Sequence, residues 1–446
     1  MTLARTAYQK LLAWKRRPQH RALLISGARQ VGKTYLVREF ARAEYGAFLE
    51  INFIETPSAV QAFEGDLDAQ TIITNLSVYA ASPLVPGNTL VFLDEVQMCP
   101  RARTAIKFLV DDGRFDYIES GSLLGVTYQA VPSIPVGYEE QLQLMPLSLS
   151  EFFGACGIQR EVLDHVGGCV RAGRPVPEPI HSRLLRLFRI YMAVGGMPAA
   201  VQAYVDSFDL AAVLQIQRDV LALYRQDIAR YAPDKPHVHR IFDAIPAELD
   251  KKNKRFMLSD LAKSARMNRY ESDFMWLVDA GVGLPCYNAT APVVPLAVNV
   301  RRNLFKLFLC DVGLLAAVAV GPVQRELIQG DLSINWGSFL ENAVAQQLAA
   351  CGIDLYYYDK SKIGEVDFLV QRAGRVVPLE AKSGADYTKH RALDNLMAVE
   401  EWGLAQGVVL CGGNVAAEGR LVYVPWYALA CLEVVDADDA SFVVEL

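Results

Sequence analysis

Residues 27–34 read Gly27-Ala28-Arg29-Gln30-Val31-Gly32-Lys33-Thr34, and this stretch decides the fold of the first part of the chain. It matches the pattern GxxxxGK[ST], follows an apolar run at residues 22–25 and precedes a helical pattern. Glycines let the backbone curl so that its N–H groups point at phosphate oxygens, and the next helix presents its positive end to the same anion. The alternative is a glycine turn beside a surface lysine, which requires no such strand–loop–helix context. The stretch therefore predicts a nucleotide-binding loop in a parallel α/β sheet.

The same loop predicts how the nucleotide is held. We expect Lys33 to reach the β- and γ-phosphates and the Thr34 hydroxyl to ligate Mg²⁺. ATP and Mg²⁺ are thus the expected cofactors. The expected nucleotide-binding residues are Gly27, Ala28, Arg29, Gln30, Val31, Gly32, Lys33, Thr34, Tyr35 and Ser120.

Two later strands end in polar residues of the same kind of site. The apolar run at residues 90–93 leads into Asp94 and Glu95, and parallel strands carry ligands at their carboxyl ends. We expect Asp94 to hold Mg²⁺ indirectly and Glu95 to act as the catalytic residue that orients or deprotonates water. A further strand ends at Ser120-Gly-Ser122, where either serine is a candidate contact of the γ-phosphate. A plain Ser-Gly turn is the alternative there.

Composition excludes several classes of protein. The 446 residues are 52% hydrophobic and 21% charged, unlike a disordered or low-complexity chain. The longest apolar run, residues 312–323, is shorter than the roughly 18 residues that a membrane span needs, so we expect a cytoplasmic protein with no membrane partner. Eight cysteines form no CxxC pair, which argues against structural zinc and a disulfide framework.

The net charge of -6 comes from 44 Lys+Arg and 50 Asp+Glu and argues against a protein that coats nucleic acid indiscriminately. The charge is unevenly distributed. Residues 1–38 contain Lys and Arg but no acid, whereas residues 433–446 contain acids but no base. A local basic face is therefore still able to meet phosphate.

Length and pattern predict three domains. Residues 1–155 alternate apolar runs and helical patterns, with strands expected at 22–25, 48–53, 90–93, 115–118 and 142–147. Residues 156–330 are expected to be helical and winged-helix-like. Residues 331–446 return to an α/β pattern, with a helix at 336–350 and strands near 355–358, 366–371 and 375–382.

The phosphate loop and the two polar strand ends resemble those of AAA+ ATPases. Over almost its whole length the chain is also similar to one branch of them, bacterial and archaeal P-loop ATPases with an uncharacterised C-terminal domain. The strings that carry this likeness are Leu144-Met-Pro-Leu-Ser-Leu-Ser-Glu-Phe, Val194-Gly-Gly-Met-Pro-Ala, Tyr224-Arg-Gln-Asp-Ile-Ala-Arg-Tyr, Phe305-Lys-Leu-Phe-Leu-Cys-Asp-Val-Gly-Leu-Leu, Gly337-Ser-Phe-Leu-Glu-Asn and Glu365-Val-Asp-Phe-Leu-Val.

One feature of that family is missing. AAA+ enzymes usually place an arginine after the Ser-Gly-Ser strand end, and this branch often has Gly-Arg or Gly-Lys before the Pro-Leu-Ser segment. Here the position reads Gly137-Tyr138, and no Lys or Arg occurs between Arg114 and Arg160. Such an arginine contributes about 10³–10⁵ in rate, so without a substitute we expect slow hydrolysis. The candidate substitutes are Arg29, Arg101, Arg103, Arg225 and Arg230.

The middle segment has the order of a winged helix, with helices expected at 256–265 and 268–280 and two strands within 282–310. Arg266, Arg269 and residues 251–255 make it basic. One interpretation is DNA binding through the second helix. The other is a lid or docking platform with a solvated basic face, which is favoured because no Asn, Gln or Arg cluster aims at base edges.

The last domain carries acids and a lysine in an order that resembles the PD-(D/E)xK nuclease core. If Ala373-Gly374 is a hairpin turn, Asp367 lies opposite Glu380 at about 5 Å, and Lys382 points to the same face. We expect Glu341, Asp367 and Glu380 to bind Mg²⁺, and Glu380 and Lys382 to be catalytic. The alternative is simple ion pairing, Glu380–Lys382 or Glu365–Lys382, in a nuclease fold that only binds.

Two hypotheses follow. In the first, ATP binding or hydrolysis controls a nuclease-like C-terminal domain that acts on or binds DNA. In the second, the chain is a nucleotide-dependent switch for a protein partner, and its C-terminal domain is catalytically silent. The basic N-terminal segment favours the first hypothesis, whereas the acidic total and the missing arginine favour the second.

Overall fold

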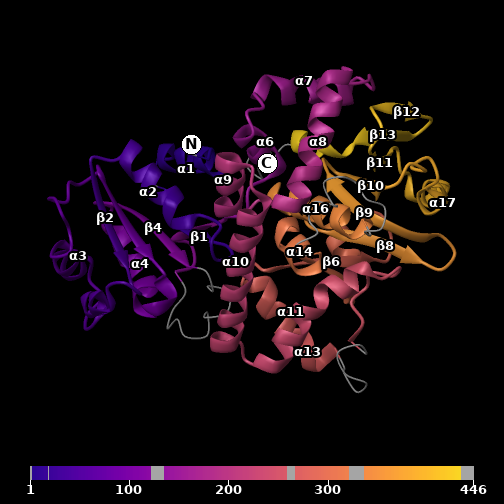
Figure 1. The fold of residues 1–446 in the computed structure, drawn as a ribbon. Coiled ribbons are helices and arrows are strands. Elements are labelled where there is room, and N and C mark those ends of the chain that lie inside the picture. The colour runs from indigo at the N-terminus through magenta and orange to yellow at the C-terminus, as the bar shows by residue number, and fades with distance from the viewer. Residues whose placement is uncertain (1–2, 19, 122–134, 259–266, 321–335, 433–446) are drawn as a thin grey trace, which may run out of the picture. The chain divides into compact units, whose positions relative to one another are not determined.

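The computed structural model describes residues 3–18, 20–121, 135–258, 267–320 and 336–432 (Figure 1). The chain divides into two compact units. The N-terminal unit comprises Met1–Met145 and Ser272–Val282, and the C-terminal unit comprises Pro146–Glu271 and Gly283–Leu446. Across the described ranges, no helix combines the length and apolar character needed to cross a lipid bilayer. The division into three domains at residues 155 and 330 stays a prediction.

A five-stranded parallel sheet in the order β2-β3-β4-β1-β5 forms the centre of the N-terminal unit. This sheet fits the predicted P-loop NTPase fold. Its elements are α1 (Ala7–Arg16), β1 (Ala22–Ser26), α2 (Lys33–Glu44), β2 (Ala47–Asn52), η1 (Pro57–Phe63), α3 (Ala69–Ser77), β3 (Thr89–Asp94), η2 (Val96–Met98), α4 (Pro100–Asp112), β4 (Asp116–Gly121) and β5 (Glu139–Gln143).

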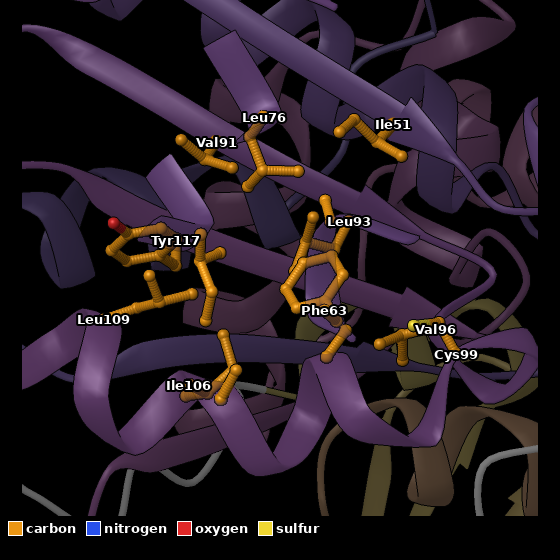
Figure 2. Close-up of a cluster of buried hydrophobic side chains, with 14 of the residues drawn as sticks. Ile51, Phe63, Leu76, Val91, Leu93, Val96, Cys99, Ile106, Leu109 and Tyr117 are labelled. Atoms are coloured by element: carbon orange, nitrogen blue, oxygen red, sulfur yellow. The ribbon is translucent and has the colours of Figure 1, made fainter. Parts of the chain in front are cut away.

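An apolar core covers one face of this sheet and fixes its strands (Figure 2). Strand β2 alternates buried and half-buried residues, so Leu49 and Ile51 lie on one face together. Helix α4 presents Ala102, Ile106 and Leu109 to the core at helical spacing. Full burial of a Leu or Ile side chain contributes about 1.5–3 kcal/mol. The core therefore holds the carboxyl ends of the strands in a defined arrangement.

The fifth strand corrects its prediction. The apolar pattern places a strand at residues 142–147, whereas β5 lies at Glu139–Gln143. Because β5 is the last strand of the sheet, beside β1, its residues Gln141 and Gln143 remain exposed and the strand needs no apolar pattern. Leu144 and Leu147 are buried beyond the end of the strand. The pattern thus marked a buried connection and placed the edge strand too late in the sequence.

Helices fill the first part of the C-terminal unit, in line with the helical pattern expected after residue 156. Residues 259–266, which hold most of the first expected winged-helix helix and Arg266, lie outside the described residues, as does Ser122. The helices are α6 (Leu149–Ala155), α7 (Arg160–Arg171), α8 (Glu178–Val194), α9 (Pro198–Ser207), α10 (Leu210–Tyr231), α11 (Lys235–Asp250) and α13 (Met267–Asp279), of which the residues from Ser272 onward belong to the N-terminal unit.

An eight-stranded mixed sheet in the order β12-β13-β11-β10-β9-β8-β6-β7 forms the rest of the C-terminal unit. Helix α16 packs against β6, β7 and β10, whereas α17 packs against β9 and β10. The elements are β6 (Gly283–Ala289), η4 (Leu296–Asn299), β7 (Val300–Leu309), α14 (Val312–Ala319), α16 (Trp336–Ala350), β8 (Tyr356–Lys360), β9 (Gly364–Arg372), β10 (Arg375–Ala381), α17 (Arg391–Met397), η6 (Glu400–Trp402), β11 (Gly407–Cys411), β12 (Ala416–Glu418), β13 (Leu421–Pro425) and η7 (Trp426–Cys431).

Strands β6 and β7 differ from the expected wing. They pair with each other as the sequence predicts, but β6 also pairs in parallel with β8, so both strands extend the C-terminal sheet. Strand pairing over more than 60 residues is not encoded in local periodicity. The winged-helix interpretation accordingly receives no support from these strands.

Asp311 lies where three of the family-like strings meet. Its buried carboxylate accepts hydrogen bonds from Gly196 N (2.6 Å), Leu314 N (2.9 Å) and Gln346 Nε2 (3.2 Å). Gly196 in turn accepts from Leu147 N at 2.6 Å. These strings therefore meet at one buried junction and stabilise the fold of the C-terminal unit.

Candidate functional site

The phosphate-binding loop lies between β1 and α2, as predicted. Gly27 has a φ of 143°, and a Cβ atom there would lie 2.2 Å from the Leu144 carbonyl oxygen, so only glycine fits. Gly32 precedes α2 in a left-handed conformation, with a φ of 92°, and the helix begins at Lys33. The loop therefore adjoins the positive end of α2, which is the arrangement that binds phosphate.

Lys33 is held at this loop. Its buried side chain donates from Nζ to the carbonyl oxygens of Gly27 at 2.8 Å and Ala28 at 3.0 Å. A charged donor fixed in this way is placed for phosphate oxygens. Of the other predicted loop contacts, Val31 is buried and Tyr35 is half-exposed.

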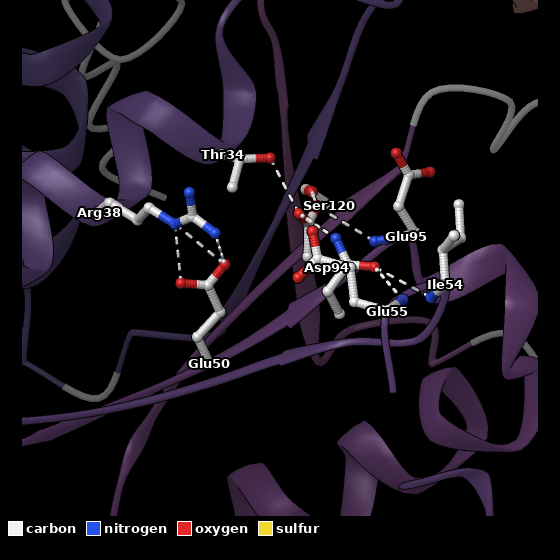
Figure 3. Close-up of polar contacts among 9 residues, drawn as sticks. Thr34, Arg38, Glu50, Ile54, Glu55, Asp94, Glu95 and Ser120 are labelled. Carbon is white, nitrogen blue, oxygen red and sulfur yellow. Dashed lines mark hydrogen bonds and ion pairs between the residues drawn. The ribbon is translucent and has the colours of Figure 1, made fainter. Parts of the chain in front are cut away.

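Asp94 gathers the polar ends of several elements (Figure 3). Its buried carboxylate accepts from Thr34 Oγ1 at 2.8 Å, from the Glu95 amide at 3.1 Å and from Ser120 Oγ. Thr34 lies in the first turn of α2, Asp94 ends β3, and Ser120 is the last residue but one of the neighbouring strand β4. The structure thus brings together the three side chains that the sequence assigned to Mg²⁺ and phosphate.

Asn52 is a member of this site that the sequence reasoning missed. Its Nδ2 donates to Asp94 at 3.1 Å, and its Oδ1 accepts from the amides of Ile54 (2.9 Å) and Glu55 (3.1 Å). Asn52 lies directly opposite Asp94 in the parallel pair β2–β3. Asn52 could have been found in the sequence, because it is a polar residue at the carboxyl end of a strand, which is how Asp94 was identified.

Glu95 lies just beyond β3 in a left-handed conformation, with a φ of 55°. Such a conformation is uncommon for a residue other than glycine and occurs often at functional positions. Gln97 Nε2 donates to its carboxylate at 2.5 Å. The backbone turn and this hydrogen bond orient the side chain that the sequence assigned to water activation.

Gly281 is a second neighbour of the loop that the sequence reasoning missed. A Cβ atom at this position would lie 2.8 Å from the Ala28 backbone nitrogen. Gly281 belongs to the Ser272–Val282 part of the N-terminal unit, so a segment distant in sequence lies against the phosphate loop. No motif could have indicated this contact.

Two of the candidate substitute arginines have structural roles in the N-terminal unit. Arg101 donates to the carbonyl oxygens of Phe63 (2.7 Å) and Gly65 (2.6 Å), and Arg103 is buried and pairs with Glu139 at 2.9 Å. Arg29 lies on the loop itself.

The other two candidates belong to the C-terminal unit. Arg225 pairs with Asp243 at 2.9 Å, and the Arg230 guanidinium lies over the Tyr231 ring.

Glu119, the residue before Ser120, is fully buried near Arg103 and Glu139. Burial, with a smaller contribution from Glu139, raises the pKa of this carboxyl well above its usual range, although Arg103 opposes the shift. The uncharged form of Glu119 is therefore favoured, which reduces the negative charge at this end of β4.

In the C-terminal unit, the hairpin turn at Ala373-Gly374 is confirmed, and both residues have positive φ. The β9–β10 register runs from Arg375 opposite Arg372 to Leu379 opposite Phe368, and one further step brings Glu380 opposite Asp367. Asp367 Oδ2 accepts from the Ala381 amide at 2.8 Å. Asp367 and Glu380 therefore lie in one region of the sheet, as predicted. Together with Glu341 they are called the carboxylate cluster below.

Lysines engage the cluster, and the sequence reasoning missed two of them. Lys254 Nζ contacts Glu341 Oε1, and the fully buried Lys306 lies 3.4 Å from Glu341 Oε2 and 2.5 Å from Glu365 Oε1. Lys382 pairs with Glu380 at 2.8 Å, as one alternative anticipated. Glu365, by contrast, pairs with Lys306 and not with Lys382. For Lys306 the sequence did contain a signal. It is a single lysine in the apolar strand Phe-Lys-Leu-Phe-Leu, and a buried lysine needs an acidic partner.

The pKa shifts follow from this arrangement. Burial opposes ionisation of Glu341, but Lys306 and Lys254 outweigh it and hold its pKa below the usual range. Burial, with Glu341 and Glu380 adding repulsion, raises the pKa of Asp367 well above its usual range. Burial also raises the pKa of Glu380, although Lys382 opposes the shift. Of these three carboxyl groups, Glu341 is therefore the one whose surroundings favour the charged form.

The cluster meets part of what a cation site requires. Glu380 Oε2 is buried and has no hydrogen-bond partner among the described residues, and its side chain is 9% exposed. Carboxylate oxygens are the ligands that Mg²⁺ prefers. Both oxygens of Glu341, however, contact lysines, and in the described ranges no trio of Asp, Glu, His or Cys side chains is arranged to hold a metal ion.

Family models match three stretches of the chain. Residues 19–153 match an AAA domain, and this match supports an AAA-type, ATPase-like first part of the chain and the predicted ATP binding. Residues 185–324 and 336–429 match two domains of unknown function, DUF8612 and DUF4143, and neither description names a nuclease. No curated protein matches the chain.

Solved structures with some similarity include the Walker-type ATPase of Pyrococcus abyssi, at 14% identity and a TM-score of 0.44 over 72% of this chain and 96% of that one. The Aeropyrum pernix ORC1 protein in complex with DNA has 12% identity and a TM-score of 0.27, covering 73% and 94%. Cdc6p from Pyrobaculum aerophilum has 14% identity and a TM-score of 0.24, covering 73% and 94%.

Proposed function

We propose that the N-terminal unit binds and hydrolyses Mg-ATP. The observation that carries this proposal is the single carboxylate of Asp94, on which Thr34, Asn52 and Ser120 converge beside the phosphate loop. Residues 27–35 would hold the phosphates. Thr34 and Asp94 would hold Mg²⁺, whose oxygen preference suits a hydroxyl and a carboxylate, and the ion would supply charge stabilisation of the transferred phosphoryl group.

In this proposal Glu95 orients the attacking water and accepts its proton, and Ser120 contacts the γ-phosphate from the end of β4. Hydrolysis is slow, because Arg101 and Arg103 are engaged in structural contacts. An arginine at the phosphate contributes about 10³–10⁵ in rate, so we expect turnover lower than in an arginine-assisted ATPase by a factor of that order.

Nucleotide binding and hydrolysis are tested separately. Titration with ATP and Mg²⁺ should show binding by the wild type and strongly weakened binding by Lys33→Ala, because that variant loses the charged donor at the loop. The Glu95→Gln variant should bind ATP as the wild type does and hydrolyse it more slowly. Equal affinity in wild type and Lys33→Ala would overturn the assignment of the loop.

We propose further that the C-terminal domain, from about residue 331, acts on DNA in a metal-dependent, nuclease-like way. Glu341, Asp367 and Glu380 would hold Mg²⁺, and Glu380 and Lys382 would be the catalytic pair that activates water and stabilises the phosphate. The orphaned Glu380 Oε2 supports a cation at this position. The protein would act in the cytoplasm, with ATP controlling the C-terminal domain.

A specific observation also favours the alternative, a nucleotide-dependent switch for a protein partner with a silent C-terminal domain. Lys254 and Lys306 already neutralise Glu341, as cross-linking ion pairs would in a fold that has lost its chemistry. Incubation with Mg²⁺ or Mn²⁺, ATP and single-stranded, duplex and branched DNA separates the two. Cleavage that Glu380→Ala abolishes supports the nuclease, whereas absent binding and cleavage support the switch.

A further inference from the structure

Arg5 is a charged residue outside the nucleotide motifs that nevertheless contacts the phosphate loop. It lies two residues before the start of α1. Its guanidinium donates from Nη1 to the Val31 carbonyl oxygen at 2.9 Å and from Nη2 to the Met145 carbonyl oxygen at 2.6 Å. These partners are 26 and 140 positions away in the sequence. One side chain therefore joins the phosphate loop to the connection that follows β5.

Packing of α1 against α2 fixes the position from which Arg5 reaches the loop. Leu11 and Trp14 of α1 are buried. The Tyr8 ring lies edge-on to the Phe40 ring of α2, with the ring centroids 5.7 Å apart. Arg5 directly precedes this helix, and its carbonyl oxygen accepts a hydrogen bond from the Tyr8 amide at 3.0 Å. A packed helix therefore holds the guanidinium at the loop.

The loop needs support at this point because Val31 lies between two residues in left-handed conformations. Gln30 has a φ of 67° and Gly32 has a φ of 92°. A positive φ is unfavourable for a residue other than glycine, and it persists only where the surrounding contacts enforce it. The hydrogen bond from Arg5 to the carbonyl oxygen of the buried Val31 is one of these contacts.

The Val31 carbonyl group decides where the next amide points. A peptide bond is planar and trans, so its C=O and N–H groups point in opposite directions. Because Arg5 holds the Val31 oxygen, the Gly32 N–H points away from the guanidinium. In loops with this sequence pattern, backbone N–H groups cradle the phosphates of the nucleotide. Arg5 is therefore placed to set the orientation of an amide at the start of α2.

We propose that Arg5 is a positioning residue for nucleotide binding, which holds the Val31–Gly32 peptide so that its N–H group faces the phosphates. The inference rests on the ATP site in the proposed function and adds a residue that the loop motif does not contain. Arginine suits this role because its planar guanidinium presents donors in a fixed geometry, one for each carbonyl oxygen, whereas a lysine ammonium does not. Such support acts equally on bound ATP and on the transition state, so its loss raises KM and leaves kcat nearly unchanged.

The test measures the affinity of the full chain for Mg-ATP by calorimetric titration, and KM and kcat for ATP by phosphate release. Arg5→Met removes both hydrogen bonds and keeps an apolar stem, and Arg16→Met, at the exposed end of α1, is the matched control. We expect Arg5→Met to bind ATP about tenfold more weakly, the loss that corresponds to one hydrogen bond from a charged donor, with a similar rise in KM. Arg5→Lys should also bind more weakly than the wild type, whereas Arg16→Met should bind as the wild type does.

The outcomes separate this inference from the function on which it rests. Equal ATP affinity of wild type and Arg5→Met, at a site that Lys33→Ala still weakens, would overturn the positioning role and leave the ATP site standing. Wild-type affinity in Arg5→Lys would show that charge alone acts, and it would also overturn the positioning role. Absence of ATP binding by the wild type would overturn both the inference and the proposed function.

The kinetic constants separate positioning from a general loss of structure. A fall in kcat as large as the rise in KM would contradict an effect confined to nucleotide binding. Thermal melting checks the fold of each variant. If Arg5→Met melts early, Arg5→Lys, which keeps the charge and a long side chain, takes its place with the same expectation of a raised KM and an unchanged kcat.

Discussion

Asp94 in the N-terminal unit and Glu341 in the C-terminal unit are both buried carboxylates, but opposite kinds of group satisfy them. Asp94 accepts hydrogen bonds from neutral donors, the hydroxyls of Thr34 and Ser120 and the amide of Asn52. Glu341 contacts the ammonium groups of Lys254 and Lys306. Neutral donors orient a carboxylate and leave its charge for a cation, whereas lysines cancel that charge.

The difference has consequences for energy as well as for chemistry. Removing one partner of a buried ion pair leaves an uncompensated charge in a medium of low dielectric constant, which is strongly destabilising. Removing one neutral hydrogen bond is much less costly. Variants that disturb the partners of Glu341 should therefore mainly lower stability, whereas variants of Asp94 should mainly lower the rate of ATP hydrolysis.

The largest expected effect is on stability. Lys306→Met should lower the free energy of unfolding by about 3–5 kcal/mol, because Glu341 and Glu365 lose a fully buried partner. Urea denaturation followed by circular dichroism measures the change. Lys389→Met, in an exposed pair with Asp386, is the control and should change stability little. If Lys306→Met lowers the free energy of unfolding by less than about 1 kcal/mol, the proposed difference between the ion-paired Glu341 and the neutrally bonded Asp94 is wrong.

The next effect is on catalysis. Asp94→Asn keeps the size of the side chain but not the charge that would balance Mg²⁺, so we expect ATP hydrolysis to fall by about a hundredfold to a thousandfold. Stability should change little by comparison. Phosphate release measures the rate, with Glu39→Gln, in an exposed pair with Arg42, as control. Hydrolysis at the wild-type rate would show that Asp94 only organises the strand ends.

Asp311 sharpens the comparison because it is a carboxylate of the C-terminal unit that neutral donors satisfy. Burial raises its pKa to about 6, although the amides of Gly196 and Leu314 oppose the shift. Since the folded pKa lies above the unfolded one, the folded state binds the proton more tightly, and stability from this group rises as the pH falls from about 7 to 4.

Asp311→Asn should therefore lower the free energy of unfolding by about 1–3 kcal/mol at pH 7. The NH₂ group of the new side chain would face the backbone N–H donors of Gly196 and Leu314, and a donor cannot accept their hydrogen bonds. The deficit should widen toward pH 4, because only the wild type gains from protonation. Denaturation curves at several pH values measure both the loss of stability at pH 7 and its change with pH. A deficit that is constant with pH would show that Asp311 does not titrate in this range.

The smallest expected effect concerns Asn52. Asn52→Ala removes one neutral hydrogen bond to Asp94, at 3.1 Å, which is worth about 0.5–1.5 kcal/mol. We expect ATP hydrolysis to fall by about tenfold or less, with ATP affinity nearly unchanged. Loss as large as in Asp94→Asn would mean that Asn52 contacts the nucleotide or its metal directly.

The sequence predicted those parts of the molecule in which a short motif must have particular residue types for chemical reasons. The phosphate loop and the polar end of β3 are short, and their residue types follow from phosphate and Mg²⁺, so Lys33, Thr34 and Asp94 could be identified together. The hairpin that aligns Asp367 with Glu380 was also local, since Ala373-Gly374 fixes the register. Strand β5 was misplaced because an edge strand needs no apolar pattern.

The missed residues have a different origin. Lys254 and Lys306 lie 87 and 35 positions from Glu341, and Asn52 lies 42 positions from Asp94. Periodicity and spacing report on contacts within a strand or helix, whereas these contacts depend on how the elements pair in space. A lysine within an apolar strand (Lys306) and a polar residue at a strand end (Asn52) were visible in the sequence, but their partners were not.

The pairing of β6 with β8 limits how the chain can be cut. A fragment that begins after residue 330 would contain α16 and β8–β13 but neither β6 nor β7. Strand β8 would then become an open edge, which is prone to aggregation. The fragment would also lack Lys306, the buried counter-charge of Glu341 and Glu365. A soluble, separable C-terminal piece therefore has to begin before Gly283 to keep its sheet complete, and before Lys254 to keep both ion pairs of Glu341.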